Sequence, residues 1–420
     1  MKALFYSLAV SLSIVVLSCT QDVGTVNVSY TKAIALYGDL GAIRQTPLVD
    51  RARDIVNPGK IFVSENLLIV GEEGEGVHVF DNSNPENPKN VLFVNIPGNK
   101  EFYVNEERLY GESYYDMVMI DISTISQPVL VSRIENVFSP EIYNDQGEAL
   151  IGFRFEDVTE KLDQSESYYH LISQNTVNYF DYNDILIPES SVPASFAGNS
   201  KEGIGSVNRM AYYNDHVYVI SKAFLSSFKD EGALELLSSE RIGQEMETIF
   251  PHDQKLFIGT RNSMEVLDVS NPGHPQHITS FQHANACDPV YPVGEVAYVT
   301  LRAGDGTETN CPGTQNALLV LDIKEINAPK QFQEVPMESP FGMTMIADKL
   351  YVGEGNNGLK VFDATDRLNL VLENWDKSIQ AYDVISHPTR PDILLVAGPD
   401  GLNQYSIEAD SRQLLSSVSF

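Results

Sequence analysis

Short runs of β-branched and aromatic residues, separated by Gly, Asn, Ser and Pro, recur along the chain from about Gly59 onward. In residues 59–97 this pattern predicts four strands, which contain Phe62–Val63, Leu67–Val70, Val77–Asp81 and Val91–Val94. A single four-stranded meander of this size cannot cover both of its apolar faces. We therefore expect this unit to stack against copies of itself.

The third strand of this unit recurs as a pentad that is apolar at its first and fourth positions and ends in Asp. Six copies end at Asp81, Asp121, Asp181, Asp268, Asp322 and Asp363, and two weaker copies end at Asp230 and Ser406. A proline follows several of these aspartates closely, as Pro85 follows Asp81. Because an Asp carboxylate accepts backbone N–H bonds in a turn and Pro presets φ, we interpret the aspartates as structural turn residues.

Periods of about 40 to 50 residues with four strands in each are typical of a β-propeller. The eight copies predict an all-β fold, a propeller of eight four-stranded blades within residues 51–420. Seven blades is the alternative, if one unit is incorporated differently. We expect the ring to close by packing of the last blade on the first. Two polar insertions, between Glu156 and Ser167 and between Arg302 and Gln315, are predicted as loops at which a partner could be recognised.

The pentads VHVFD, MVMID, MEVLD, LLVLD and LKVFD, followed by SNPxxP or its remnant, resemble the LVIVD repeat. That repeat is found in bacterial and archaeal cell-surface β-propeller proteins, and the resemblance covers most of the chain after Gly59. It implies a fold and a cellular location. It does not imply an activity, because the family is not tied to one reaction.

The first residues of the chain have the pattern of a targeting segment. Lys2 precedes an apolar run from Ala3 to Leu17, which as a helix reaches about 22 Å and is too short for a permanent membrane span. Val16-Leu-Ser-Cys19 resembles a bacterial lipobox, which predicts a lipoprotein signal peptide in residues 1–18 and lipidation of Cys19. Residues 19–50 are then a tether and lead-in, and the protein is expected in the cell envelope, on the outer membrane or cell surface.

The formal net charge of −30 excludes one class of partner. Nucleic acid phosphates must be met by Lys and Arg, so no nucleic acid partner is expected. The acidic balance also argues against adsorption to anionic lipid head groups, so the membrane contact is expected through the lipid alone. We interpret the charge as a solvated acidic exterior that favours basic partners or cations.

Two cysteines remain once Cys19 is assigned to the lipid. Cys287 and Cys311 are predicted within one blade, in a compartment that permits disulfides, and we expect them to form a bond. In the chain-entropy model, closing a loop of that length stabilises by about 3–4 kcal/mol. Two free thiols is the alternative.

The sequence contains no complete metal-binding or catalytic motif. His274, His277, His283 and Cys287 lie along one segment, but His277 and His283 would be about 20 Å apart on an extended strand. The acidic turn at Glu72, Glu73 and Glu75 could attract calcium, but it lacks the alternating spacing of a calcium loop. No G-x-S-x-G, H-E-x-x-H or P-loop motif occurs. We therefore assign no catalytic residue, metal ligand or cofactor, and leave calcium as a possibility to test.

A propeller offers one further place for chemistry, the mouth of its axial channel. The residues that start each innermost strand line this mouth, and we predict them to be Lys60, Glu101, Glu141, Arg209, Glu247, Asp288, Phe341 and Asp383. Five carboxylates and two cations in one ring could hold a cation or a polar ligand. The alternative is a hydrophilic tunnel filled with water.

These observations favour a binding or scaffold module for a protein or a small polar ligand. The rival class is a propeller enzyme, such as a lactonase-like hydrolase or lyase with a metal in the channel.

Overall fold

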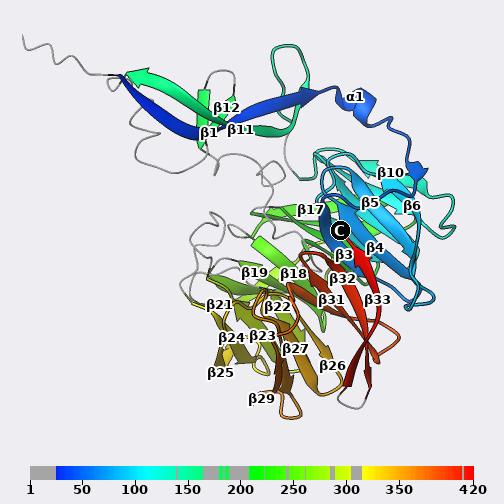
Figure 1. The fold of residues 1–420 in the computed structure, drawn as a ribbon, viewed down its shortest axis with the longest axis vertical. Coiled ribbons are helices and arrows are strands. Elements are labelled where there is room, and N and C mark those ends of the chain that lie inside the picture. Colours follow the sequence, from blue (N-terminus) through cyan, green and yellow to red (C-terminus); the bar gives the residue numbers. More distant parts are fainter. Residues whose placement is uncertain are drawn as a thin grey trace, which may run out of the picture. The chain divides into compact units, whose positions relative to one another are not determined.

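The computed structural model describes residues 25–138, 141–163, 179–182, 185–188, 208–221, 223–242, 246–260, 262–283, 289–303, 315–408 and 411–420. The chain divides into two compact units. One contains residues 1–35 and 154–191, and the other contains residues 36–153 and 192–420. Figure 1 shows the strands of both units.

The first unit is built around one four-stranded sheet with the order β11-β1-β12-β13. Its strands are β1 (Thr25–Gly38), β11 (Ala149–Asp163), β12 (Tyr179–Tyr182) and β13 (Ile185–Pro188). β12 runs parallel to β1, with Lys32 opposite Tyr179, and forms an antiparallel pair with β13. Asp181 therefore lies in this sheet and not in the third strand of a blade, as the repeat pattern predicted.

The described residues of the second unit form a β-propeller of seven sheets. The prediction of an all-β propeller is confirmed, with the seven-blade alternative in place of eight. The unit around Asp181 accounts for the difference, because its strands pair with β1 instead of with a blade. The weak repeat at Asp230 does form a blade.

The strands of the first four blades follow one another along the chain. Blade 1 contains β2 (Val49–Arg51), β3 (Pro58–Val63), β4 (Leu67–Glu72), β5 (Gly76–Asp81) and β6 (Lys89–Asn95). Blade 2 contains β7 (Phe102–Asn105), β8 (Arg108–Ser113), β9 (Asp116–Asp121) and β10 (Val129–Ile134). Blade 3 contains β14 (Met210–Tyr213), β15 (His216–Ser221), β16 (Phe224–Asp230) and β17 (Leu234–Arg241). Blade 4 contains β18 (Met246–His252), β19 (Lys255–Thr260), β20 (Ser263–Asp268) and β21 (Gln276–Gln282).

The other three blades repeat this order. Blade 5 contains β22 (Val290–Val293), β23 (Val296–Leu301), β24 (Ala317–Asp322) and β25 (Lys330–Pro336). Blade 6 contains β26 (Met343–Ile346), β27 (Lys349–Gly353), β28 (Leu359–Asp363) and β29 (Val371–Asp376). Blade 7 contains β30 (Asp383–Ser386), β31 (Ile393–Gly398), β32 (Gly401–Glu408) and β33 (Ser411–Ser419).

Each blade packs on the next through its own group of buried apolar side chains, one group for each of the seven interfaces. The group between blades 7 and 1 includes Leu68 and Val70 on one side and Leu395 and Leu402 on the other. It closes the ring, and Figure 1 shows the red strands of blade 7 beside the blue strands of blade 1. The sheets therefore cover one another's apolar faces, which explains why the third strands are apolar on both sides.

A register shift between the third and fourth strands occurs in every one of these seven blades. Such a bulge increases the local twist and turns the outer strand away from the sheet. The outer strands are accordingly more exposed than the inner ones, as at Val129, Phe332 and Val371.

The repeat aspartates lie in the turns that follow the third strands. The carboxylates of Asp81, Asp121, Asp230, Asp268, Asp322 and Asp363 each accept a bond from the backbone N–H two residues later. The turn of blade 1 also contacts blade 7, because the Pro85 carbonyl accepts the hydroxyl of Ser416 at 2.6 Å. The repeat motif thus shapes a turn and, in blade 1, joins the last blade to the first.

The lead-in is fixed to the propeller at two places. β2 pairs with β6 as a fifth, outermost strand of blade 1. The short helix α1 (Leu40–Ile43) is capped by Asp39, whose carboxylate accepts the N–H of Gly41. Arg44, which follows it, binds Asp116 of blade 2 at 2.8 Å.

Candidate functional site

Six of the predicted mouth residues lie in the described part of the propeller where innermost strands begin. They are Lys60 in β3, Glu101 before β7, Arg209 before β14, Glu247 in β18, Phe341 before β26 and Asp383 in β30. Because all seven innermost strands begin on the same side of the ring, these residues surround one end of the channel.

Glu141 is a correction to this prediction. It precedes the strands of the first unit and not an innermost strand, because the Asp181 unit is not a blade. Its carboxylate accepts a bond from Arg44 at 2.7 Å, beside the pair between Arg44 and Asp116. Glu141 thus helps to hold the lead-in. Asp288 lies outside the described residues, as do Cys19, Cys287 and Cys311.

Three of the mouth residues form one ion network with a fourth side chain that the sequence did not single out. Glu101 pairs with Lys60 and lies 3.5 Å from Nε of Arg209. Nη2 of Arg209 lies 3.3 Å from Oε2 of Glu112. The side chains of Lys60, Glu101 and Glu112 are buried, whereas that of Arg209 is 28% exposed. Of these four side chains, that of Arg209 is therefore the most accessible to solvent.

Burial lowers the pKa of Lys60, although Glu101 and Asp383 oppose that effect. Asp383 belongs to blade 7, which packs directly on blade 1, so its carboxylate is close enough to favour the charged form of Lys60. The pKa of Arg209 is raised: burial lowers it, but Glu112 and Glu101 outweigh that effect. Arg209 therefore stays charged.

Glu112 has two counterparts at the same distance before a repeat aspartate, Glu72 in blade 1 and Glu354 in blade 6. Glu72 accepts the backbone N–H groups of Val56 and Asn57, at 3.1 and 2.6 Å, and pairs with His78. These N–H groups belong to the loop that leads into the innermost strand. The carboxylate thus clamps that loop to the second strand.

Glu354 makes the same clamp in blade 6. It accepts the N–H groups of Glu338 and Ser339, the latter at 2.7 Å, and pairs with Lys360. Both side chains of the pair are buried. The matching partner in blade 1 is the imidazole of His78, and burial lowers its pKa, although Glu72 opposes that effect.

Glu112 does not make this clamp. The N–H donor fifteen residues earlier, which is Asn57 or Ser339 in the other two blades, is replaced by Pro97, which has no N–H. The loop of blade 2 is held by Asn99 instead, whose side-chain amide donates to the carbonyls of Glu101 and Glu112, at 3.0 and 2.9 Å.

The carboxylate of Glu112 is therefore left with Arg209. Its other oxygen, Oε1, is buried with no hydrogen-bond partner among the described residues. Burial raises the pKa of Glu112 to about 7, opposed by Arg209 and Lys100. A carboxyl group in this state exchanges a proton at neutral pH.

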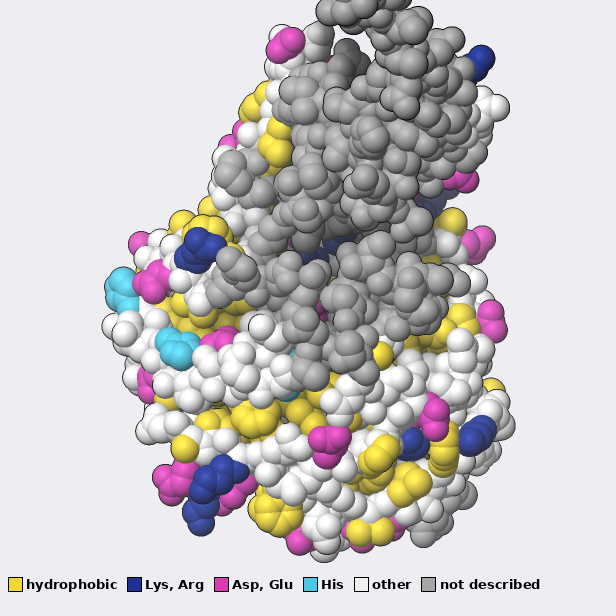
Figure 2. Space-filling model, turned by 90° about the vertical axis from the view of Figure 1, so that its left-hand side faces the viewer, with side chains coloured by type: hydrophobic (Ala, Val, Ile, Leu, Met, Phe, Trp, Pro, Cys, Tyr) yellow, Lys and Arg dark blue, Asp and Glu magenta, His cyan; other side chains and the backbone are white. Residues whose placement is uncertain are grey.

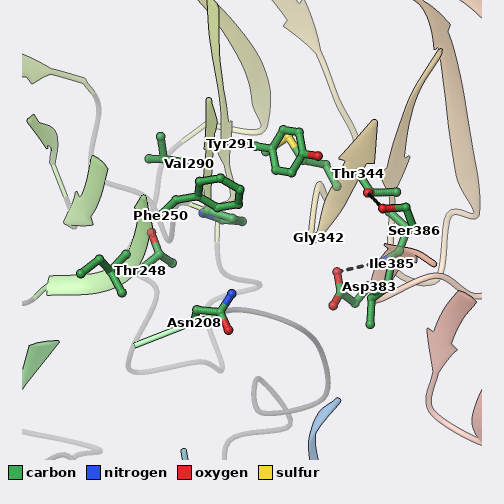
Figure 3. A pocket seen from close by; sticks show the side chains of 14 residues that line it. Asn208, Thr248, Phe250, Val290, Tyr291, Gly342, Thr344, Asp383, Ile385 and Ser386 are labelled. Carbon is green, nitrogen blue, oxygen red and sulfur yellow. Dashed lines mark hydrogen bonds between the residues drawn. The ribbon is translucent and has the colours of Figure 1, made fainter. Parts of the chain in front are cut away.

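A cavity of about 200 Å³ lies beside the network, among the innermost strands of blades 4 to 7. Figure 3 shows the rings of Phe250 and Tyr291 on one side and Asp383, Thr344 and Ser386 on the other, with Asn208 below Phe250 in this view. The hydroxyl of Thr344 donates to that of Ser386 at 3.0 Å. Asn208 directly precedes Arg209, so the cavity and the network are adjacent.

The backbone leaves room for Asp383 only because residue 342 is glycine. A Cβ atom at Gly342 would lie 1.6 Å from Oδ1 of Asp383. The carboxylate also accepts the N–H of Val384 at 2.8 Å, which fixes its direction. Phe341 packs beside this point, under Arg302 at 4.4 Å and against Tyr382.

Four of the candidate metal residues make contacts with other side chains or with the backbone. His277 binds Glu265 at 2.8 Å, and His274 lies 3.7 Å from Glu240. In the acidic turn, Glu72 makes the clamp and Glu75 pairs with Arg53. Over the described ranges, no group of three or more His, Cys, Asp or Glu side chains is arranged to hold a metal ion.

The surface fits the acidic composition. On the face in Figure 2, the acidic side chains that are drawn in magenta are scattered among polar and apolar ones and form no single patch. In the part of the chain that the structure describes, no helix has both the length and the apolar character to cross a membrane.

Comparisons with solved structures show the fold. The periplasmic gluconolactonase PpgL of Pseudomonas aeruginosa superposes with a TM-score of 0.53 at 12% identity, over 84% of this chain and 96% of that one. A functionally unknown protein from Desulfotomaculum acetoxidans gives 0.50 at 10% identity, over 86% and 95%. Saccharomyces cerevisiae Sqt1 gives 0.50 at 9% identity, over 89% and 88%. At such identities the likeness extends to the fold alone.

Comparisons of sequence are narrower. No curated protein sequence matches the chain. The model of the LVIVD repeat matches residues 113–136 and 256–282, which contain the third strands of blades 2 and 4. The family resemblance inferred from the pentads is confirmed at these repeats. The chain is therefore a β-propeller that carries LVIVD repeats.

Proposed function

We propose that this propeller is a lipid-anchored binding module of the cell envelope that takes a small polar ligand at the mouth of its channel. One observation carries the binding part of the proposal. A cavity with hydroxyl, amide and carboxylate groups lies next to a partly exposed arginine of an otherwise buried ion network. Pockets of this kind, with a few convergent polar groups, are the usual binding sites of folded domains.

The size of the cavity limits the ligand. About 200 Å³ is less than the roughly 300–1,000 Å³ of sites for drug-sized molecules. The lining combines two aromatic rings with hydroxyl and amide groups, which suits a molecule with apolar C–H faces and several hydroxyl groups. A monosaccharide or a molecule of similar size and polarity fits this description.

Localisation rests on the sequence. The lipobox-like Val16-Leu-Ser-Cys19 supports an anchor at Cys19, and a short tether follows it. The LVIVD repeats support a place at the cell surface, because the resembling family is found there.

The test is a calorimetric screen of small sugars, sugar acids and amino acids against the full chain. We expect at least one to bind, and Asn208→Ala to weaken it by about tenfold, because a hydrogen bond in the cavity is lost. Asn374→Ala, on the exposed outer strand of blade 6, is the matched control and should leave binding unchanged. Binding that both variants reduce equally, or none at all, would refute the channel site.

One observation favours a second candidate, a lactonase-like hydrolase. Glu112 has a pKa of about 7, which suits a general acid or base at neutral pH. The gluconolactonase with which the fold superposes makes a lactone a reasonable substrate to try. Hydrolysis of glucono-lactone above the uncatalysed rate, lost in Glu112→Gln, would favour the enzyme over the binding module.

A further inference from the structure

Glu112 is the one of the three equivalent glutamates whose carboxylate is not used to hold a loop. Glu72 and Glu354 each bind two backbone N–H groups and one side chain, the imidazole of His78 or the ammonium group of Lys360. In blade 2, Pro97 removes a donor and Asn99 holds the loop in its place. A buried carboxylate with an unpartnered oxygen costs stability, and the clamp that offsets this cost in the other two blades is absent here.

Arg209 is the group of this network that a ligand meets first. Lys60, Glu101 and Glu112 are each at least nine-tenths buried, whereas Arg209 is partly exposed. Its contacts with Glu101 and Glu112, at 3.5 and 3.3 Å, are longer than a usual charge-assisted bond of about 2.7–2.9 Å. A guanidinium held this loosely can turn toward a planar anionic group, which it binds through two parallel N–H bonds.

We propose that Arg209 binds the carboxylate of a small organic acid at the channel mouth, and that Glu112 takes up a proton from solvent as this ligand binds. This inference rests on the proposed binding site and specifies its ligand class. The ligand carboxylate takes the place of the Glu112 carboxylate beside Arg209. One proton passes from water to Glu112, and no other bond is made or broken.

The charges around Glu112 support this exchange. Arg209 and Lys100 favour its ionised form, whereas burial and Glu101 favour its protonated form, and the balance leaves its pKa at about 7. Lys60 faces Glu101, and Glu73 influences both Lys100 and Arg209. A second anion at Arg209 adds repulsion and competes for the cation that stabilises ionised Glu112. Both effects raise the pKa of Glu112, so binding and protonation support each other.

The test uses D-glucuronate, with D-glucose as a match that lacks the carboxylate. With one proton taken up by a group of pKa about 7, the affinity of the full chain for glucuronate should fall about tenfold from pH 6 to pH 8. Glu112→Gln should make this affinity independent of pH, and Arg209→Gln should reduce it at every pH. Calorimetry of the native protein at pH 7 in two buffers of different ionisation enthalpy should report proton uptake, and it needs no variant.

Each outcome of these measurements either supports the proposal or overturns it. No glucuronate binding, an affinity that does not change with pH, or equal affinity for glucose overturns the proposal. Glucose binding that depends on Asn208 would leave the channel site standing while this inference fails. If Glu112→Gln does not fold, judged by circular dichroism, the absence of proton uptake by the native protein still refutes it.

Discussion

Blades 1 and 6 place a glutamate where blade 2 places Glu112, yet only the first two glutamates hold a loop. Glu72 and Glu354 hold the loop that leads into their blade, and each has a side-chain partner from the third strand, His78 or Lys360. Glu112 holds no loop, and it contacts an arginine from the next blade. The difference lies in the partners, since Pro97 cannot donate an N–H bond and Asn99 substitutes for the clamp. Because Asn99 holds the loop of blade 2, the carboxylate of Glu112 is available for another contact.

The largest effect is expected from breaking a clamp. Glu354→Ala leaves Lys360 as a buried charge without its carboxylate and removes the acceptor of two N–H groups. Removing one partner of a buried pair costs about 3–5 kcal/mol of unfolding free energy, to be measured in urea. Glu373→Ala, which breaks the exposed pair with Lys349, should cost less than about 1 kcal/mol. Equal losses in the two variants would contradict the clamp.

The second effect concerns Glu112 and has the opposite sign. Burial raises its pKa from 4.5 to about 7, so its contribution to stability is present below pH 4.5 and is lost as the pH rises through 7. Glu112→Gln is neutral at every pH. Its free energy of unfolding should therefore exceed that of the native protein by up to about 3 kcal/mol at pH 8. At pH 4 the two free energies should be nearly the same.

Denaturant titrations at both pH values check this difference. A variant that is less stable than the native protein at pH 8 would show that the contact between Arg209 and Glu112 outweighs the cost of burying the carboxylate. Glu112 would then be structural, like its counterparts.

The smallest effect tests the residue that replaces the clamp. Asn99→Ala removes two buried bonds, to the carbonyls of Glu101 and Glu112, and should cost about 1–3 kcal/mol. Asn374→Ala on the exposed outer strand is the control and should stay within about 0.5 kcal/mol. If the two variants are equally stable in urea, the loop of blade 2 is held by something other than Asn99.

The pattern of strands predicted the propeller because each blade has its own apolar pentad and turn. It counted one blade too many because the hairpin of β12 and β13 is as apolar and as short as a pair of blade strands. Sequence periodicity does not show which strand is the partner, and here β12 pairs with β1, far earlier in the chain. The Asp181 error then displaced Glu141, which was placed at the mouth by counting blades.

The site was predicted in part. Lys60, Glu101, Arg209 and Asp383 were placed at the starts of innermost strands, where the structure has them, because these starts can be located from the repeat. Glu112 was missed because it lies on a second strand and not at the start of an innermost one. It directly follows a glycine, as Glu72 and Glu354 do, so the local sequence does not distinguish it from them. Its distinguishing signal is Pro97, fifteen residues away, and that signal has meaning only once the clamp of the other blades is known.

The seam between blades 7 and 1 has a consequence for how the chain reaches its final form. Ile61, Leu68, Val70 and Phe80 are covered by residues 393–418, which are synthesised more than 300 residues later. Until those residues are synthesised, one apolar face of blade 1 is uncovered. Closing so long a loop costs conformational entropy before the contacts between blades 7 and 1 stabilise the ring. A chain that lacks residues 393–418 therefore exposes these apolar side chains to water, where they favour aggregation.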